Sequence, residues 1–224
     1  MRIRIGQYLL VLLLLTPSLL FAQDNPDPAR FEREIQAFRD WDAKNTPAEN
    51  AILFIGSSSI RMWPTAKSFP ELKVINRGFG GSHISDVLHY LPDLFPQYNP
   101  SKIVFYAGDN DVTSGKSPEQ VLRDYKAFVE AVHREKPGLP IIFVSIKPSP
   151  VRMNVWPQMK AANELIEAFS EATDHLYYAD VATPMLDADG NPDRSLFLDD
   201  DLHLNEKGYA LWSRTLLPII HSAE

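Results

Sequence analysis

The chain has 224 residues, with 22 lysines and arginines against 29 acidic residues, 45% hydrophobic residues and no cysteine. This composition excludes a disulfide-stapled mini-protein, thiolate chemistry, cysteine-ligated metals and a disordered chain, because enough apolar surface is available for burial. The net charge of -7, without any basic cluster, argues against a nucleic-acid partner, since such proteins gather Lys and Arg on one face.

The first 22 residues have the pattern of a secretory signal peptide. Two arginines precede an apolar run that ends at Leu15, and the small residue Ala22 closes the segment. The run is followed by Thr16-Pro17-Ser18 and is short for a bilayer span of about 20 residues, which favours cleavage over a retained anchor. We therefore expect residues 1–22 to direct export to the periplasm or the exterior, without stable membrane insertion. Residues 23–224 are then expected to form a single domain.

Along the mature chain, amphipathic helices alternate with buried strands. A helical spacing of apolar residues predicts helices around 31–41, 121–132, 159–169 and 209–216. Continuous apolar runs predict five strands, which are Ala51–Ile55, Val74–Ile75, Ile103–Ala107, Ile141–Ser145 and Leu176–Ala179. Such alternation implies parallel strands with right-handed crossovers, so we predict an α/β fold: a three-layer α/β/α sandwich with a mostly five-stranded parallel sheet. In such sheets the site lies at the carboxyl ends of the strands.

The first strand leads into Gly56-Ser57-Ser58-Ser59, a turn of small residues. Serine commonly caps helix N-termini, so this segment alone favours a cap over a nucleophile. A serine hydroxyl becomes a useful nucleophile only beside a general base that a third group orients. The functional interpretation therefore needs a histidine and an acid elsewhere in the chain.

Asp200 and His203 are candidates for that pair. An acid three residues before a histidine can share one face of a turn, so Asp200 could hold the imidazole Nδ1–H and leave Nε2 to take a proton from a serine. The alternative is that Asp199–Asp201 form a solvated acidic loop that caps the next helix. The adjacent histidine leaves these two interpretations about balanced.

Two further segments follow strand ends, Asn76–Ser82 after the second strand and Gly108–Asp111 after the third. Turn chemistry alone explains their glycines, asparagines and aspartates. A glycine can also expose a backbone N–H to a developing negative charge, and an asparagine amide at a strand end suits donation to an oxyanion. Both interpretations stay open for both segments.

Together, four blocks of the chain resemble the SGNH hydrolases, also called the GDSL-type lipase and esterase family. The blocks are Gly56-Ser57-Ser58-Ser59, Gly81, Gly108-Asp109-Asn110-Asp111 and Asp200-Asp201-Leu202-His203. The resemblance extends from Ile52 to Tyr209 and implies the flavodoxin-like SGNH hydrolase fold. It also implies a catalytic triad of Ser58, Asp200 and His203, with an oxyanion hole formed by Ser58, Gly81 and Asn110.

The resemblance implies two-step acyl transfer through an acyl-enzyme, with no cofactor and no metal. Within the family we expect a serine esterase for short-chain acyl groups, such as acetyl on a glycan, with lysophospholipase and thioesterase as alternatives. The expected partner is thus a small-molecule or glycan ester, and the oligomeric state cannot be read from the motifs. Two alternatives from other classes are a metal-dependent phosphoesterase, using the aspartates and His203 as ligands, and a binding module with a decayed site.

The chain departs from the family pattern at three serines. Ser57 and Ser59 replace the Asp and Leu that usually flank the nucleophile, and Ser82 stands where many relatives have Asp. Outside the four blocks, Trp63 and Trp156 could line a groove but more often such residues fill a core edge. Arg61 and Arg77 are expected to pair with surface acids rather than to steer an anionic substrate. The loop Lys147-Pro148-Ser149-Pro150 follows the fourth strand and could form a rigid pocket wall.

Overall fold

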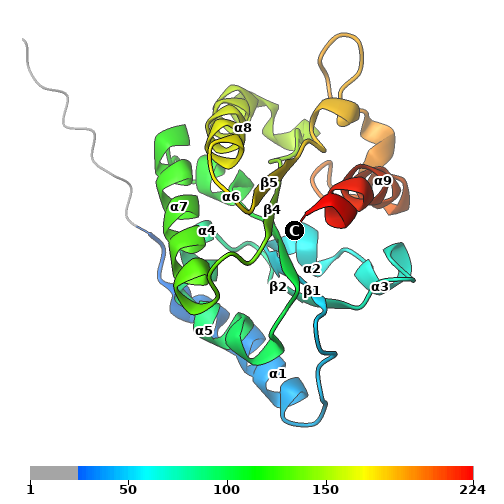
Figure 1. The fold of residues 1–224 in the computed structure, drawn as a ribbon. Helices are drawn as coiled ribbons and strands as arrows, with labels where there is room; N and C mark the ends of the chain where they lie inside the picture. Colours follow the sequence, from blue (N-terminus) through cyan, green and yellow to red (C-terminus); the bar gives the residue numbers. More distant parts are fainter. Residues whose placement is uncertain (1–24, 224) are drawn as a thin grey trace, which may run out of the picture.

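Five parallel strands form the central sheet of the computed structural model, which describes residues 25–223 (Figure 1). They are β1 (Ile52–Gly56), β2 (Val74–Gly78), β3 (Lys102–Tyr106), β4 (Ile141–Val144) and β5 (Leu176–Ala179). Their order is β2-β1-β3-β4-β5, and every neighbouring pair is parallel. From β1 the chain first adds β2 on one side, then crosses back over β1 and adds β3, β4 and β5 on the other side. This topological switch between β1 and β3 is where open α/β sheets form their crevice.

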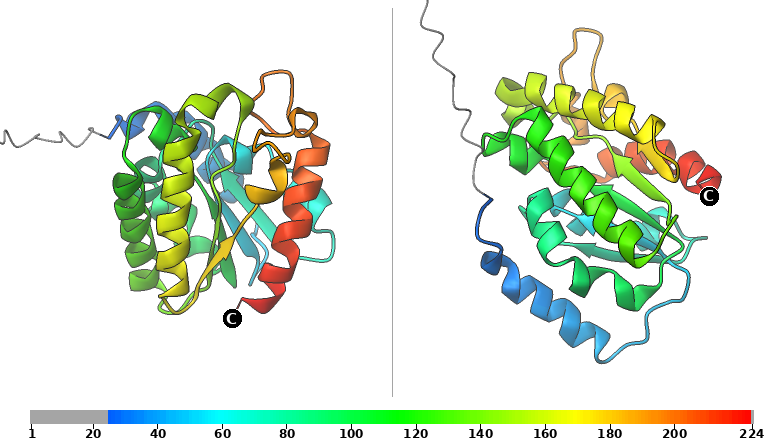
Figure 2. Two further views of the ribbon diagram at one scale, coloured as in Figure 1. Left: turned by 90° about the horizontal axis from the view of Figure 1, so that it is seen from above. Right: turned by 60° about the vertical axis from the view of Figure 1, so that its left-hand side comes forward.

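Helices cover both faces of this sheet, which confirms the predicted α/β/α sandwich (Figures 1 and 2). One face carries α1 (Glu32–Asp42), α4 (Ile84–His89), α5 (Leu91–Leu94), α7 (Pro118–Glu135) and α8 (Trp156–Glu171). The other carries α2 (Ser58–Arg61), α3 (Thr65–Ser68) and α9 (Glu206–Ser222). The remaining helix α6 (Asp109–Thr113) follows β3, and the 3-10 turns are η1 (Pro28–Phe31), η2 (Pro96–Tyr98), η3 (Pro150–Val155), η4 (Thr183–Met185) and η5 (Arg194–Leu196).

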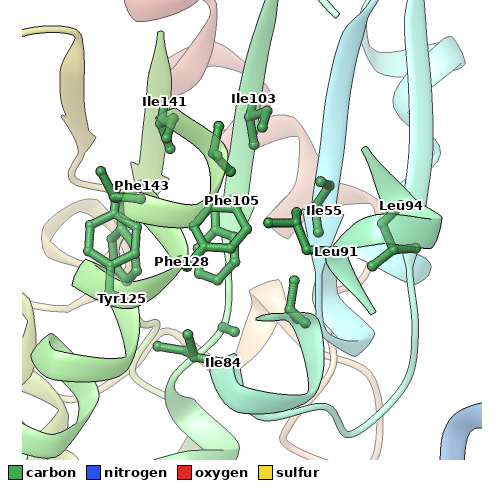
Figure 3. Packing of buried hydrophobic residues seen from close by; sticks show 14 of the residues in the cluster. Ile55, Ile84, Leu91, Leu94, Ile103, Phe105, Tyr125, Phe128, Ile141 and Phe143 are labelled. Carbon is green, nitrogen blue, oxygen red and sulfur yellow. The ribbon is translucent and has the colours of Figure 1, made fainter. Parts of the chain in front are cut away.

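The core consists of two apolar clusters, one on each side of the sheet. Along β1, Leu53 and Ile55 enter the cluster under α7, whereas Ile52 and Phe54 enter the cluster under α9. Successive side chains of a strand point to opposite faces, so a strand with helices on both sides must be apolar at every position. Figure 3 shows part of the first cluster, in which Phe105 packs against Phe128. The continuous apolar runs of the sequence follow from this double burial.

The start of α7 follows the local rules of helix capping. The Ser117 side chain accepts a hydrogen bond from the Gln120 N–H, and the Gln120 side chain accepts one from the Ser117 N–H. Pro118 occupies the first helical turn, where a missing N–H costs nothing. This capping box fixes the start of α7 at Pro118, before the apolar spacing that begins at Val121.

Strand β2 is longer than its apolar residues predict. It continues through two polar residues to Gly78 because each has hydrogen-bonding partners in the fold. Asn76 donates to the carbonyls of Ile60 and Trp63, and Arg77 pairs with Asp42 at 2.6 Å. The extra residues bring the end of β2 level with the end of β1, which positions the glycine segment beside the serine turn.

The predicted signal segment, residues 1–22, lies outside the described residues. Among residues 25–223, no helix combines the length and the apolar composition needed to cross a bilayer.

Candidate active site

The serine turn is shaped by a close approach of two strand ends. Gly56 has φ of 145°, and a Cβ there would lie 1.9 Å from the Tyr106 carbonyl oxygen, so only glycine fits. The Ser57 N–H donates to the same carbonyl at 2.9 Å, which ties the end of β1 to the end of β3. Helix α2 then begins at Ser58, so this half-buried serine stands at the carboxyl edge of the sheet.

The three serines of this turn have different surroundings. Ser58 Oγ lies 3.1 Å from His203 Nε2. Ser59 Oγ instead accepts a hydrogen bond from the buried Lys147 Nζ at 3.1 Å, and the buried Ser57 hydroxyl has no partner among the described residues. Ser58 is therefore the serine of the turn whose hydroxyl lies at an imidazole.

A short turn holds the histidine and its acid together. His203 Nδ1 lies 2.6 Å from Asp200 Oδ2, while Asp200 Oδ1 accepts the backbone N–H groups of Leu202 and His203, both at 2.9 Å. Because an ionised carboxylate only accepts, the imidazole proton belongs on Nδ1, and Nε2 is left to accept from Ser58. Ser58, His203 and Asp200 thus form one hydrogen-bonded chain.

The Asp200 carboxyl is ionised at neutral pH. Burial raises its pKa, but hydrogen bonds from the His203 ring and from the backbone N–H groups of His203 and Leu202 outweigh that effect and lower the pKa to about 2. Its negative charge favours a proton on the imidazole, as transfer from a serine requires.

The other two predicted oxyanion residues lie on neighbouring strand ends. Gly81 follows β2 with φ of 79°, and the space next to its Cα is open. Asn110 is the second residue of α6, and its Nδ2 donates to the Ser82 carbonyl at 3.1 Å. Within residues 25–223, no acceptor occupies the N–H of Ser58, the N–H of Gly81 or the second hydrogen of Asn110 Nδ2. These donors remain available to a ligand.

A buried carboxylate anchors the segments that carry these donors. Asp111 accepts the Ile84 N–H at 3.2 Å and pairs with the buried Lys116 at 3.0 Å. Asp111 directly follows Asn110 in the sequence, and its partner Ile84 lies two residues after Ser82. Burial raises the pKa of Asp111 to about 6, against the opposing effect of Lys116. Asp111 therefore ties the segment after β2 to the segment after β3.

Sequence reasoning missed a network of buried charges beneath the serine turn. Lys147, predicted only as part of a pocket wall, is fully buried and donates to Ser59 Oγ, to the Tyr106 hydroxyl and to Asp109 Oδ2, all at 3.0–3.1 Å. Arg152 of η3 also pairs with Asp109 at 3.0 Å. No spacing in the sequence indicates these contacts, because they join residues 38 or more positions apart. Only the unusual Lys in an apolar stretch after β4 hints at them.

Burial shifts the pKa values of both Asp109 and Lys147 in this network. Burial raises the pKa of Asp109, but the charges of Lys147 and Arg152 outweigh it and hold the pKa below its ordinary value. Burial lowers the pKa of Lys147, and Asp109 opposes that shift. Asp109 is therefore kept ionised under the serine turn.

The residues outside the four blocks have mixed outcomes. Trp63 is 2% exposed and packs in the core under α9, whereas Trp156 is half-buried against the cluster on the other side of the sheet. Arg77 pairs with an acid as predicted, but it is buried against aromatic rings rather than at the surface. The expected acidic partner of Arg61 is not found among residues 25–223, and its exposed guanidinium lies against Gly80. Whether each of these side chains is buried or exposed depends on the folded structure, and the sequence alone does not reveal it.

The aspartates that a metal site would need are held by cations. Asp109 is paired with Lys147 and Arg152, and Asp201 is paired with Arg194 at 2.6 Å. Across residues 25–223, no group of three or more His, Asp or Glu side chains is arranged to hold a metal ion. The arrangement instead favours chemistry at the Ser58 hydroxyl.

Solved structures with the same fold include several hydrolases. A protein from Streptococcus pneumonia described provisionally as a platelet activating factor has a TM-score of 0.76 at 23% identity, covering 86% of this chain and 94% of that chain. A GDSL-like lipase from Bacteroides thetaiotaomicron has a TM-score of 0.69 at 20% identity, covering 88% and 98%. An acetyl esterase mutant with an acetate ion has a TM-score of 0.63 at 15% identity, covering 77% and 96%. A comparison with curated proteins found no match.

A family model supports the same assignment from the sequence. The model of the GDSL-like Lipase/Acylhydrolase family matches residues 61–211, which is more than half of the chain. The match begins just after Ser58 and includes Gly81, Asn110, Asp200 and His203. The chain therefore belongs to the GDSL-like lipase/acylhydrolase family and is a hydrolase of ester substrates.

Proposed function

We propose that the protein is a serine esterase that hydrolyses short-chain acyl esters through Ser58, His203 and Asp200. The observation that carries this proposal is the unbroken hydrogen-bonded chain from Ser58 Oγ through the imidazole to the Asp200 carboxylate. A serine hydroxyl at neutral pH is a weak nucleophile, and such a chain is the arrangement that activates it.

In the acylation step, Ser58 Oγ attacks the ester carbonyl carbon while His203 Nε2 takes the hydroxyl proton. The Asp200 carboxylate stabilises the imidazolium that results. The N–H groups of Ser58 and Gly81 and the Asn110 amide donate to the oxyanion of the tetrahedral intermediate. Collapse of the intermediate expels the alcohol, which takes the proton from His203, and leaves the acyl group on Ser58.

In the deacylation step, water replaces the alcohol. His203 takes a proton from the water as it attacks the acyl-enzyme carbonyl, and the same donors hold the second oxyanion. The intermediate then releases the carboxylic acid, and His203 returns its proton to Ser58 Oγ. The cycle consumes one ester and one water and needs no other reactant.

The surroundings of Ser58 favour a small acyl group. Next to Ser58, the side chains of His203 and Asp200 are 21% and 46% exposed, so this side of the site is open to solvent. A long acyl chain gains affinity mainly by burial of its methylenes, and residues this exposed to solvent offer little of that burial. The similarity in fold to an acetyl esterase is in keeping with this choice. We propose acetyl esters, including acetylated glycans, as the substrate class.

A panel of esters tests the proposal. Rates are measured for p-nitrophenyl esters from acetyl to dodecanoyl, for an acetylated xylo-oligosaccharide, for a lysophospholipid and for an acyl thioester. We expect kcat/KM to be highest for acetyl esters and to fall as the acyl chain lengthens, with no effect of a chelator. Activity should vanish in Ser58→Ala and persist in Ser57→Ala, a matched control because the Ser57 hydroxyl has no partner.

Each other result identifies a different function. A preference for the lysophospholipid or the thioester would replace the acetyl-ester proposal with another activity of the family. Phosphoester cleavage that a chelator abolishes and that survives Ser58→Ala would identify a metal-dependent enzyme. Glycan binding without turnover would identify a binding module.

A further inference from the structure

Arg152 in η3 lies beside the proposed oxyanion hole, yet none of the catalytic steps above uses it. Its Nη2 donates to Asn110 Oδ1 at 2.9 Å, and its Nη1 lies 3.0 Å from Asp109 Oδ2. The side chain is 15% exposed, so both contacts are largely shielded from water. Asp109 also accepts the Asn110 N–H at 3.0 Å. Arg152 and Asp109 therefore hold Asn110 by its side chain and its backbone.

The Arg152 contact determines which way the Asn110 amide faces. A guanidinium can only donate and the Ser82 carbonyl can only accept, so Oδ1 must face Arg152 and Nδ2 must face Ser82. In a flipped amide, Nδ2 would face the Arg152 donor and Oδ1 would face the Ser82 carbonyl oxygen, so neither contact would be a hydrogen bond. Since Ser82 takes one Nδ2 hydrogen, the second N–H is left for the oxyanion.

The same contact adds positive charge to the site. Lys147 and Arg152 are two cations around the single carboxylate of Asp109, which leaves an excess of one positive charge next to Asn110. Lys147 is completely buried, so little water screens this charge. A guanidinium bound to Oδ1 also polarises the amide and strengthens its N–H as a donor. Both effects favour the negative charge that develops in the transition state.

We propose that Arg152 is a positioning residue of the oxyanion hole, which acts by holding and polarising the Asn110 amide. This inference rests on the proposed function. Arg152 exerts its effect through Asn110 and does not contact the substrate. Its loss should therefore lower kcat and leave KM nearly unchanged, because the oxyanion exists only after Ser58 has attacked.

A double-mutant cycle with Asn110 tests this role. The variants are Arg152→Met, which keeps the length of the side chain, Asn110→Ala, and the two combined, assayed with p-nitrophenyl acetate. Loss of one oxyanion donor typically costs about 100- to 1000-fold in kcat, and loss of a residue that orients it about 10- to 100-fold. We expect Arg152→Met to lower kcat in the wild-type background and to have almost no effect in the Asn110→Ala background. An equal loss in both backgrounds, an unchanged kcat, or a rise in KM alone would overturn the proposal.

A second readout separates positioning from a loss of structure. A short alkyl boronic acid forms a tetrahedral anionic adduct with a serine, so Arg152→Met should weaken its inhibition by about the same factor as kcat. Unchanged inhibition would overturn the proposal. Arg134→Met, at the exposed end of α7, is the matched control and should behave like wild type. Arg152→Lys keeps the charge without the forked donors, so it should lose less activity than Arg152→Met. This difference between the two variants should disappear in the Asn110→Ala background.

The dependence of activity on Ser58 separates a wrong role for Arg152 from a wrong proposed function. An enzyme that retains its activity in Ser58→Ala refutes the serine mechanism as a whole. Additive losses in an enzyme that depends on Ser58 refute only the role of Arg152.

Discussion

The two halves of the candidate site are held in different ways. On one side, Asp109 and Lys147 have side chains that are 3% and 0% exposed, and their partners come from strands and turns far away in the sequence. On the other side, Asp200 and His203 have side chains that are 46% and 21% exposed, and their mutual contacts span only four residues of a loop. One half depends on the packed fold, and the other on a local turn.

This difference matches what each half must do. In the proposed mechanism, the donors around Asn110 act on a charge that develops and decays in place, which is stabilised best by fixed dipoles in a dry setting. In the same proposed mechanism, His203 takes and returns protons and meets water in the deacylation step, so it needs access to solvent. The buried half should therefore govern stability and the oxyanion, and the exposed half should govern proton transfer.

The largest effect is expected at the exposed half. His203→Gln removes the base and should lower kcat for p-nitrophenyl acetate by at least about 10,000-fold, because Ser58 then has no acceptor for its proton. The thermal unfolding temperature should fall only slightly, since the partner Asp200 is 46% exposed and solvent screens its contact with the ring. His221→Gln, at the exposed end of α9, is the control and should keep full activity. Near-normal turnover in His203→Gln would refute the division of roles.

The next effect concerns the buried half. Lys147→Met leaves Asp109 with one cation in place of two and should lower the free energy of unfolding in urea by about 3 kcal/mol. The contrasting variant is Arg194→Met, which breaks an ion pair whose arginine side chain is 71% exposed. Its cost should stay below about 1 kcal/mol and shrink as salt is added. Equal costs for the two variants would show that burial does not distinguish the two halves.

The smallest effect is a pH dependence from Asp200. Its pKa of about 2 in the folded protein lies below the ordinary 3.8, so its contacts stabilise the folded state above pH 3.8. That contribution is lost as the pH falls through about 2. The difference in unfolding free energy between wild type and Asp200→Asn should thus be constant above pH 3.8 and shrink below it. A difference that grows on acidification would contradict the assigned direction.

The sequence predicted the local half of the site better than the buried half. The Asp200–His203 spacing placed an acid and a histidine on one turn as a candidate pair, and the family resemblance favoured that pair over a solvated acidic loop. Such a pair needs only the geometry of its own turn. The five strands were equally readable, since burial on both faces leaves continuous apolar runs. The largest departure is in β2, which Asn76 and Arg77 extend beyond its apolar residues, whereas the ends of the other strands differ from the prediction by at most about one residue.

The buried network was not readable because its contacts are set by packing. Lys147 meets Ser59 across 88 positions and Asp109 across 38, and Arg152 meets Asn110 across 42. Local spacing carries no information on such pairs, and only the carboxyl edge shared by β1, β3 and β4 brings them together. For the same reason, the core position of Trp63 and the missing acidic partner of Arg61 within the described residues emerged only from the fold.

The most direct test of the central claim is covalent labelling of Ser58. The protein is treated with a fluorophosphonate, which reacts with activated serines, and its intact mass is compared with those of Ser58→Ala and Ser57→Ala treated in the same way. We expect one adduct on wild type and on Ser57→Ala, none on Ser58→Ala, and no change with a chelator. An unlabelled wild type that is shown to be folded, or an adduct that persists in Ser58→Ala, would contradict it.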